Sequence, residues 1–400
     1  MKSQFSSTYE DDYESLMLVY CWWRSAVTFG EAAKFKVELP NVSTLTPTLK
    51  LLRELERLAL MAREGLSELR QKLVSYRSGD FWVPTGGMKR EDMDIPPVIT
   101  ILLVGFSGSG KSSLVNLMYS VLGRSGLIPF ATTSSENSAK CTTKFMEEHN
   151  VLRSMQSGFC VYDSRGLDYD LMGESIEEVS EWMTNGVHHN QLCLRTGDNL
   201  MSEEELSEVP GSSSKFTPRK VNCAMVVVNI AEIFKSLKKG DWKPLEATRE
   251  LFRCPALKKC NHHHRGADGS KGWWMPFISN HYENPILIMT HGDLLSTEER
   301  IKIRLTLCEF LGISETTGVY DIVCLTEYGF LADESDPVTS YALSEAVYRA
   351  LLISDRGHIP KRSILDWTLL ALALLMCYLA AFFEFLAEFF SKLGQKKKKL

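Results

Sequence analysis

A glycine-rich loop near residue 105 constrains the fold of this chain more than any other feature. Residues 105–112 read G-F-S-G-S-G-K-S and fit the pattern G-x-x-x-x-G-K-[ST] at every fixed position. The apolar run 99–104 leads in as a buried type of strand, and residues 114–118 lead out as a helix, which is the context this motif requires. Glycines let the backbone wrap a phosphate, so that amide groups and the helix N-terminus face its negative charge. The sequence therefore predicts a phosphate-binding loop in an α/β domain.

The residues of this loop have separate expected roles. We expect Lys111 to reach the β- and γ-phosphates of a nucleotide, and the Ser112 hydroxyl to bind Mg²⁺. The other loop residues expected to contact nucleotide are Gly105, Ser107, Gly108, Ser109, Gly110 and Ser113. The alternative is a vestigial loop in a pseudo-enzyme.

A D-x-x-G motif at residues 163–166 follows the apolar run 159–162. Asp163 at that strand end is expected to hold the Mg²⁺ shell through water, and Gly166 to offer its amide to a γ-phosphate. Upstream, Thr142 and Thr143 lie in a polar loop where a switch threonine would close on Mg²⁺, and the sequence does not separate them. The alternative for either threonine is an ordinary polar loop.

A base-reading motif is predicted at residues 290–293, after the apolar run 286–289. The segment T-H-G-D resembles the [NT]-K-x-D motif of GTPases, with Thr290, His291 and Asp293 at the matching positions. Asp293 would accept hydrogen bonds from the N1 and N2 donors of guanine, a pair that adenine lacks. Histidine replaces the expected lysine and can still stack on the base. Residues 320–326 occupy the place of a second guanine-contacting loop.

Short β-branched runs alternate with helical stretches from residue 96 to residue 355. This alternation predicts an α/β fold, a P-loop GTPase-like parallel sheet with helices on both faces. The expected strands are 98–104, 158–162, 224–230, 285–290 and 319–325. Two stretches break the pattern, and we expect insertions at 186–221, which is polar and rich in serine, and at 239–284.

The order of these motifs resembles a translation-factor-type GTPase domain. Within that class the chain is similar to the septin-like, immune-associated and chloroplast outer-envelope import GTPases, and as a whole it resembles plant P-loop nucleoside triphosphate hydrolase-like proteins. The resemblance implies binding of GTP and GDP with Mg²⁺, and slow hydrolysis. Small GTPases have a water-orienting glutamine after D-x-x-G, whereas this chain has Leu167. We therefore expect weak intrinsic turnover, accelerated by dimerisation across the nucleotide face.

The region 1–95 is predicted to be helical. A helix over 46–76 begins at Thr46, a plausible N-cap followed by proline. Its apolar side chains recur at alternating spacings of three and four at Leu52, Leu55, Ala59, Ala62, Leu66, Leu69 and Leu73. This stripe has two interpretations, a helical hairpin packed on its own domain and a short coiled-coil dimer seam.

Cysteine and histidine spacing argues against a zinc site. Cys254 and Cys260 precede His262, His263 and His264, but the short-spaced pairs that zinc sites use are missing. We interpret this stretch as a solvated polar insertion, and the pair His188-His189 as surface residues. The ten cysteines are sparse and no apolar leader is evident, so reduced thiols in the cytosol are expected.

The last forty residues differ in composition from the rest of the chain. Residues 367–383 carry no charged side chain, and lysines occupy 396–399. We expect a C-terminal transmembrane helix over 364–390 and a basic tail over 391–400, which would give a single-pass tail anchor with a cytosolic GTPase domain. The organelle stays open among the endoplasmic reticulum and the mitochondrial, peroxisomal and plastid outer membranes. The alternative is a buried helix of the soluble domain.

The sequence as a whole predicts a membrane-anchored guanine-nucleotide-binding protein, a slow GTPase that acts as a switch or scaffold. A net charge of -5 argues against nucleic acid as a partner, and a homodimer through the nucleotide face or the N-terminal helix is expected. Two other functions stay open, a P-loop ATPase and a non-hydrolysing membrane scaffold that acts through the N-terminal helices.

Overall fold

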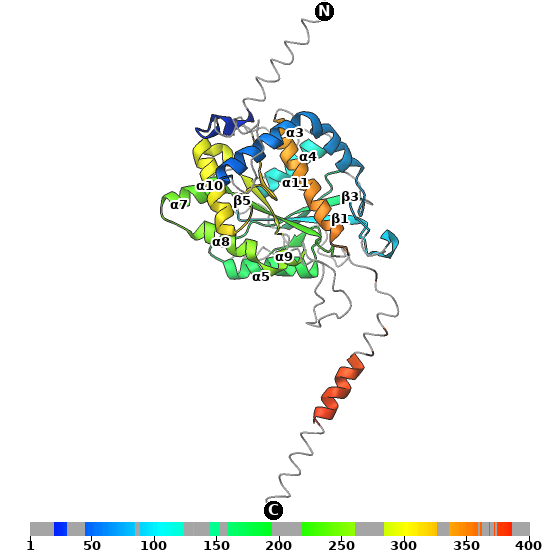
Figure 1. Ribbon diagram of the computed structural model, residues 1–400. Helices are drawn as coiled ribbons and strands as arrows, with labels where there is room; N and C mark the ends of the chain where they lie inside the picture. Colours follow the sequence, from blue (N-terminus) through cyan, green and yellow to red (C-terminus); the bar gives the residue numbers. More distant parts are fainter. Residues whose placement is uncertain are drawn as a thin grey trace, which may run out of the picture. The chain divides into compact units, whose positions relative to one another are not determined.

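The chain forms two units that are described separately. The computed structural model describes residues 20–29, 45–84, 89–123, 131, 145–152, 158–193, 218–260, 284–325, 336–358, 361, 368, 372 and 374–385. The first unit combines Met1–Val83 with Ile95–His358, and the second combines Pro84–Asp94 with Ile359–Leu400 (Figure 1). The first unit contains the predicted phosphate-binding loop.

A mostly parallel sheet forms the centre of the first unit. Its order over the described residues is β4-β2-β3-β1-β5-β6-β7. The strands are β1 (Val98–Val104), β2 (Phe145–His149), β3 (Gly158–Asp163), β4 (Gln191–Leu192), β5 (Cys223–Asn229), β6 (Ile286–Thr290) and β7 (Val319–Asp321). β3, β1, β5, β6 and β7 run parallel, whereas β2 pairs antiparallel with β3 and with β4. The parallel strands are the five runs that the sequence predicts, and the antiparallel strands β2 and β4 were not predicted.

Helices cover both faces of the sheet. One face carries α4 (Lys111–Leu122), α11 (Pro337–Arg356) and α3 (Pro47–Ser75), and the other carries α5 (Met172–Asn185), α7 (Ile230–Lys238), α8 (Lys243–Arg253), α9 (Pro255–Cys260) and α10 (Thr297–Leu311) (Figure 1). β1 is buried along its whole length because alternate side chains enter the two cores. Ile99, Ile101 and Leu103 join the first core, and Val98, Leu102 and Val104 join the second.

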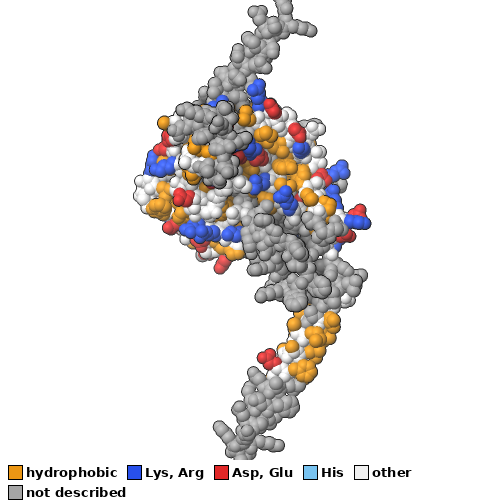
Figure 2. Space-filling model, viewed as in Figure 1, with side chains coloured by type: hydrophobic (Ala, Val, Ile, Leu, Met, Phe, Trp, Pro, Cys, Tyr) orange, Lys and Arg blue, Asp and Glu red, His pale blue; other side chains and the backbone are white. Residues whose placement is uncertain are grey.

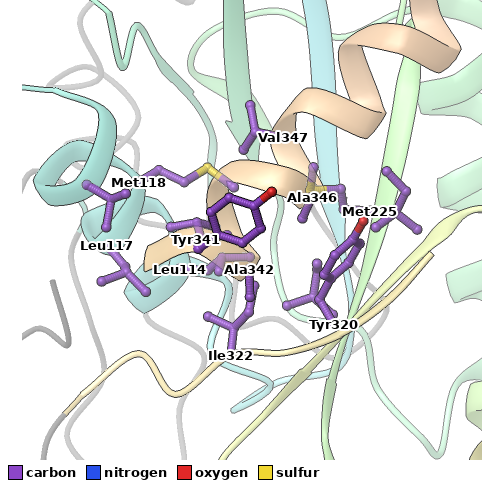
Figure 3. Packing of buried hydrophobic residues seen from close by; sticks show 14 of the residues in the cluster. Leu114, Leu117, Met118, Met225, Tyr320, Ile322, Tyr341, Ala342, Ala346 and Val347 are labelled. Atoms are coloured by element: carbon purple, nitrogen blue, oxygen red, sulfur yellow. The ribbon is translucent and has the colours of Figure 1, made fainter. Parts of the chain in front are cut away.

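The first core joins α11 to the helix that follows the phosphate-binding loop. Figure 3 shows Tyr341 and Ala342 of α11 among Leu114, Leu117 and Met118 of α4. Met225 of β5 and Tyr320 of β7 line the other side of the same cluster. Because each large apolar side chain buried here contributes about 1.5–3 kcal/mol, α11 holds α4 firmly against the sheet.

The apolar stripe of α3 packs inside the first unit. Thr46 caps the helix by accepting a hydrogen bond from the Leu49 amide at 3.4 Å, and Pro47 occupies its first turn. The buried side chains on α3 are Leu51, Leu52, Leu55, Leu58, Ala59, Ala62 and Leu73. They belong to the same core as α11, which is the helical packing that the sequence offered as one interpretation. A coiled-coil dimer seam is therefore not supported, because this core already uses the stripe.

The two stretches predicted as insertions, 186–221 and 239–284, both contain regular secondary structure near their starts. Residues 186–193 join the sheet edge, where Val187 is buried, bridges to Arg219, and is followed by β4. The polar part, 194–217, lies outside the described residues. In the second stretch, α8 and α9 bury Leu245, Leu251 and Leu257 against the second core, and residues 261–283 lie outside the described part of the chain.

The second unit includes the whole of the predicted C-terminal anchor, 364–390. Lys361 fastens its start to the short 3-10 helix η3 (Arg90–Asp92), because its amide donates to the Asp92 carbonyl at 2.7 Å. Of the expected helix 364–390, positions 368, 372 and 374–385 are described and helical. Their large apolar side chains are exposed (Figure 2). Within the described residues, none of the helices has both the length and the apolar character needed to cross a membrane. The predicted basic tail lies outside the described residues.

Candidate nucleotide-binding site

The phosphate-binding loop joins β1 to α4 at the carboxyl end of the strand. Gly110 is the N-cap of α4 and adopts a left-handed conformation, with φ of 87°. Glycine is the residue that takes this conformation without strain. The turn places Lys111, Ser112 and Ser113 in the first turn of α4, the part of a helix whose backbone amides point toward a bound anion.

Lys111 is a buried cation at the centre of this loop. Its Nζ donates to the carbonyl oxygens of Gly105 at 3.0 Å and Phe106 at 3.2 Å. Its side chain therefore folds over the loop that a phosphate would occupy. A phosphate bound there would add a charge-assisted partner for the ammonium group.

Ser112 and Asp163 form the candidate Mg²⁺ site. The Ser112 hydroxyl donates to Oδ2 of Asp163, the last residue of β3, at 2.6 Å. Burial raises the pKa of Asp163, while the Lys111 charge and the Ser112 hydrogen bond act in the opposite sense. Oδ1 of Asp163 is buried and has no hydrogen-bond partner among the described residues. A hard divalent cation is bound by such oxygens, so these two residues fit Mg²⁺.

The D-x-x-G segment lies directly against the phosphate-binding loop. The Ser107 amide donates to the Leu167 carbonyl at 2.9 Å, and the Leu167 amide donates to the Gly105 carbonyl at 3.0 Å. A Cβ on Gly166 would lie 2.6 Å from the Ser107 Cα, so only glycine fits. The Leu167 side chain is buried and cannot orient a water molecule. Gly166 therefore lies beside the phosphate-binding loop, and its contact with a γ-phosphate stays a prediction.

The predicted base motif also contacts the phosphate-binding loop. Thr290 ends β6, and its hydroxyl donates to the Ser109 carbonyl at 2.7 Å. His291 follows in a left-handed conformation, with its Nδ1 2.8 Å from the Thr290 Oγ1. Thr290 therefore ties the base motif, residues 290–293, to the phosphate half of the site. We call these four residues the base loop.

Asp293 is the exposed end of the base loop. It lies in the 3-10 helix η4 (Gly292–Leu294). Burial, and secondly the charge of Asp293, raise the pKa of Cys324 to about 12. Asp293 therefore lies near the residues after β7, where the sequence places a second guanine-contacting loop.

Some residues singled out in the sequence lie away from the nucleotide-binding site or outside the described part of the chain. Thr142 and Thr143 lie outside the described residues. His188 and His189 are half-buried, and the His189 Nδ1 accepts the Glu148 amide of β2 at 3.1 Å. They are therefore partly exposed residues of the sheet edge, which reaches further than the sequence pattern indicated.

Among the described residues, no group of three or more histidine, cysteine or acidic side chains could hold a metal ion. His262, His263 and His264 lie outside this part of the chain.

Sequence reasoning missed Asn229, which ends β5 beside the site. Its Oδ1 caps α7 by accepting the Glu232 amide at 3.0 Å, and its Nδ2 donates to the Gly108 carbonyl at 3.4 Å. The signal was available, because asparagine at the carboxyl end of a buried run combines a helix cap with a position at the strand edge where ligands bind.

A mostly parallel sheet with the glycine-rich loop between β1 and α4 fits a P-loop GTPase. No protein-family model and no curated protein matches the chain. Among solved structures, the chain is similar to Toc33 from Arabidopsis thaliana in complex with GDP and Mg²⁺, with 14% identity and a TM-score of 0.35 over 77% of this chain and 99% of the other. A dimerization-deficient mutant of Toc33 matches with 15% identity and a TM-score of 0.33, over 74% and 96% of the two chains.

A third solved structure is a signal recognition particle receptor SRb-GTP/SRX complex from Chaetomium thermophilum. It matches with 13% identity and a TM-score of 0.26, over 56% of this chain and 92% of that one.

Proposed function

We propose that this chain binds guanine nucleotides with Mg²⁺ and acts as a nucleotide-dependent switch. The observation that carries the proposal is the convergence of three motifs at one edge of the sheet. Lys111 lies in the phosphate-binding loop, Asp163 accepts from Ser112 in the first turn of α4, and Thr290 donates to the Ser109 carbonyl. The carboxyl edge of a parallel sheet is where nucleotides bind in this fold class.

Each motif has one task in this proposal. Lys111 and the amides at the start of α4 bind the phosphates, and Ser112 and Asp163 hold Mg²⁺, Asp163 through water. Bound Mg²⁺ would offset charge on the β- and γ-phosphates. Asp293 accepts from the guanine N1 and N2 groups, and His291 stacks on the base. Adenine lacks this pair of donors, so an ATP-binding site would have no use for the aspartate at this position.

Hydrolysis is proposed to be slow. Leu167 takes the place of a water-orienting glutamine, and its side chain belongs to the second core. The backbone of Leu167 is hydrogen-bonded to the phosphate-binding loop through both its amide and its carbonyl group. These bonds hold Leu167 in place, so its side chain stays in the core. A second copy of the chain across the nucleotide face is proposed to supply the missing group.

Membrane attachment through residues 364–390 completes the proposal. Its support is the run of exposed apolar side chains at 374–385, which includes Leu375, Met376 and Phe383. Exposing apolar side chains to water costs free energy, and insertion into a lipid bilayer would remove them from water. The first unit would then face the cytosol. Flotation of the full chain with liposomes, compared with a chain ending at residue 361, tests this part; equal flotation would contradict it.

Nucleotide titration tests the central part of the proposal. The full chain is titrated with GTP, GDP, ATP and ADP in Mg²⁺, and in EDTA. We expect both guanine nucleotides to bind at least tenfold more tightly than the adenine nucleotides, and Mg²⁺ to strengthen binding. Equal affinities would instead favour an ATPase, and no binding by any nucleotide would favour the scaffold.

A further inference from the structure

The strongest unassigned feature of the molecule is a stack of side chains beneath the base loop. We propose that Trp22, in the N-terminal segment 20–29, is a positioning residue for guanine recognition that acts through Arg300 and Asp321. This inference rests on the proposed function, because it concerns how Asp293 is held. It gives the N-terminal region control over base recognition without contact to the nucleotide.

The base loop rests on a buried ion pair. Arg300 in the first turns of α10 donates through Nε to Oδ2 of Asp321 at 2.7 Å, and through Nη2 to Oδ1 at 2.8 Å. Their side chains are 7% and 2% exposed. Two parallel bonds fix the plane of the guanidinium group, so the pair forms a defined surface.

Gly292 of the base loop lies on this surface. A Cβ at Gly292 would be 2.4 Å from the Arg300 Nε and 2.9 Å from the Asp321 Oδ1. The backbone next to Asp293 therefore follows the position of the ion pair. Asp293 itself is exposed, so its direction depends on the backbone that carries it.

Trp22, in the N-terminal segment, packs its ring against the guanidinium group of Arg300. The Arg300 Cζ lies 4.1 Å from the centre of the Trp22 ring, a distance at which a cation and an aromatic face attract. Asp321 also fixes the end of β7, which leads to the second expected guanine loop. One stack thus supports both sides of the base site.

Polar contacts fasten the same segment to the start of α10. Thr297 Oγ1 donates to the Trp22 carbonyl at 3.3 Å, and the Val27 amide donates to Glu298 Oε1 at 3.1 Å. These residues follow the base loop by only a few positions. Trp22 is also set edge-on to Trp23, whose Nε1 donates to Glu56 of α3 at 2.7 Å. The N-terminal helices are therefore linked to the base loop through contacts of the first unit.

The test compares GDP and ADP affinities of the full chain and its variants in Mg²⁺. Trp22→Ala should lower the GDP-over-ADP affinity ratio about tenfold, the size of effect expected of a desolvated stacking cation. Its ADP affinity should change less than about twofold, since the phosphate half is untouched. Trp22→Phe should retain the ratio because it keeps an aromatic face. Trp242→Ala, which removes an exposed tryptophan at the start of α8, serves as the matched control.

A double-mutant comparison separates this inference from the proposed function. In an Asp293→Asn background, Trp22→Ala should cause no further loss of the GDP-over-ADP ratio. A wild-type chain without guanine preference overturns both proposals. The wild-type chain could prefer GDP over ADP, with Asp293→Asn abolishing this preference and Trp22→Ala leaving it intact. That result overturns only the role of Trp22. Equal loss of GDP and ADP affinity in Trp22→Ala assigns Trp22 a structural role and also overturns it. If Trp22→Ala does not fold, Arg300→Lys carries the same comparison.

Discussion

The two halves of the candidate site are built differently. The phosphate half is built mainly from the loop between β1 and α4, with Lys111 folded onto its own loop and Ser112 hydrogen-bonded to Asp163 at the end of β3. The base half is exposed at Asp293, and its support comes from Trp22, Arg300 and Asp321 on distant parts of the chain. We therefore expect phosphate binding to depend mainly on one strand-loop-helix unit. Base recognition depends on the fold as a whole.

Removing the central cation should break the phosphate half. Lys111→Ala is expected to weaken GDP and ADP binding alike, by more than about 100-fold, because a buried charge-assisted contact to phosphate is lost. Calorimetric titration of both nucleotides measures the effect. Lys239→Ala, on the exposed end of α7, is the control. A loss confined to guanine nucleotides would contradict the division into two halves.

The water-orienting position cannot be restored by a single substitution. Leu167→Gln should leave hydrolysis unchanged and lower the free energy of unfolding by about 1–3 kcal/mol, because a buried amide would lack partners. Single-turnover GTP hydrolysis and urea denaturation measure the two parts. Leu167→Met, which keeps an apolar side chain of similar volume, is the control. Fast hydrolysis by the glutamine variant would show that the side chain reaches the nucleotide.

The Mg²⁺ site should be separable from phosphate binding itself. Ser112→Ala is expected to remove most of the Mg²⁺-dependent gain in GDP affinity, about tenfold, while binding in EDTA changes little. The reason is that the hydroxyl is expected to bind the cation, whereas the amides serve the phosphates. Ser113→Ala, which removes the neighbouring hydroxyl but keeps the backbone amide expected to face a phosphate, is the matched control. Equal loss in Mg²⁺ and in EDTA would place Ser112 on a phosphate instead.

A smaller, pH-dependent effect is expected beside the phosphate-binding loop. Tyr169 stacks on Phe106 with ring centres 4.0 Å apart, and its hydroxyl donates to Glu232 at 3.3 Å. Burial raises the pKa of Glu232, and the Tyr169 hydrogen bond opposes it. A raised carboxyl pKa means that the folded state loses stability as pH rises from the unfolded value of about 4.3 through the folded value.

Glu232→Gln should remove this pH-dependent loss. We expect the variant to gain less than about 1 kcal/mol over wild type above the folded pKa, since Glu232 is only half-buried and solvent screens its charge. Urea denaturation from about pH 4 to about pH 8, a range that covers the titration of such a carboxyl group, measures this difference in the free energy of unfolding. A wild-type profile that matches the variant throughout would contradict the prediction.

Much of the fold could be predicted from the sequence because parallel strands are buried on both faces. The run 98–104 is apolar almost throughout, and β1 has those bounds in the structure. β2 was missed because Glu147, Glu148 and His149 fill an antiparallel strand near the sheet edge, where polar side chains are tolerated. β4 has two residues and leaves no periodic pattern.

The candidate site divides in the same way. The phosphate loop and the motifs at Asp163 and Thr290 could be predicted because each is a short pattern at a strand end, and such ends meet at one edge of the sheet. The contact of Trp22 with Arg300 joins residues far apart in sequence and follows no local spacing. Thr142 and Thr143 stay predictions.

The most direct test of guanine recognition exchanges the base that the site accepts. Xanthine carries an oxygen where guanine carries its 2-amino group, so an asparagine at 293 can donate where aspartate could only accept. Asp94→Asn, at an exposed aspartate of the second unit, is the matched control. We predict that Asp293→Asn lowers GDP affinity at least tenfold and raises xanthosine diphosphate affinity, which reverses the preference of the wild-type chain. Unchanged affinities for both nucleotides in Asp293→Asn would contradict the account.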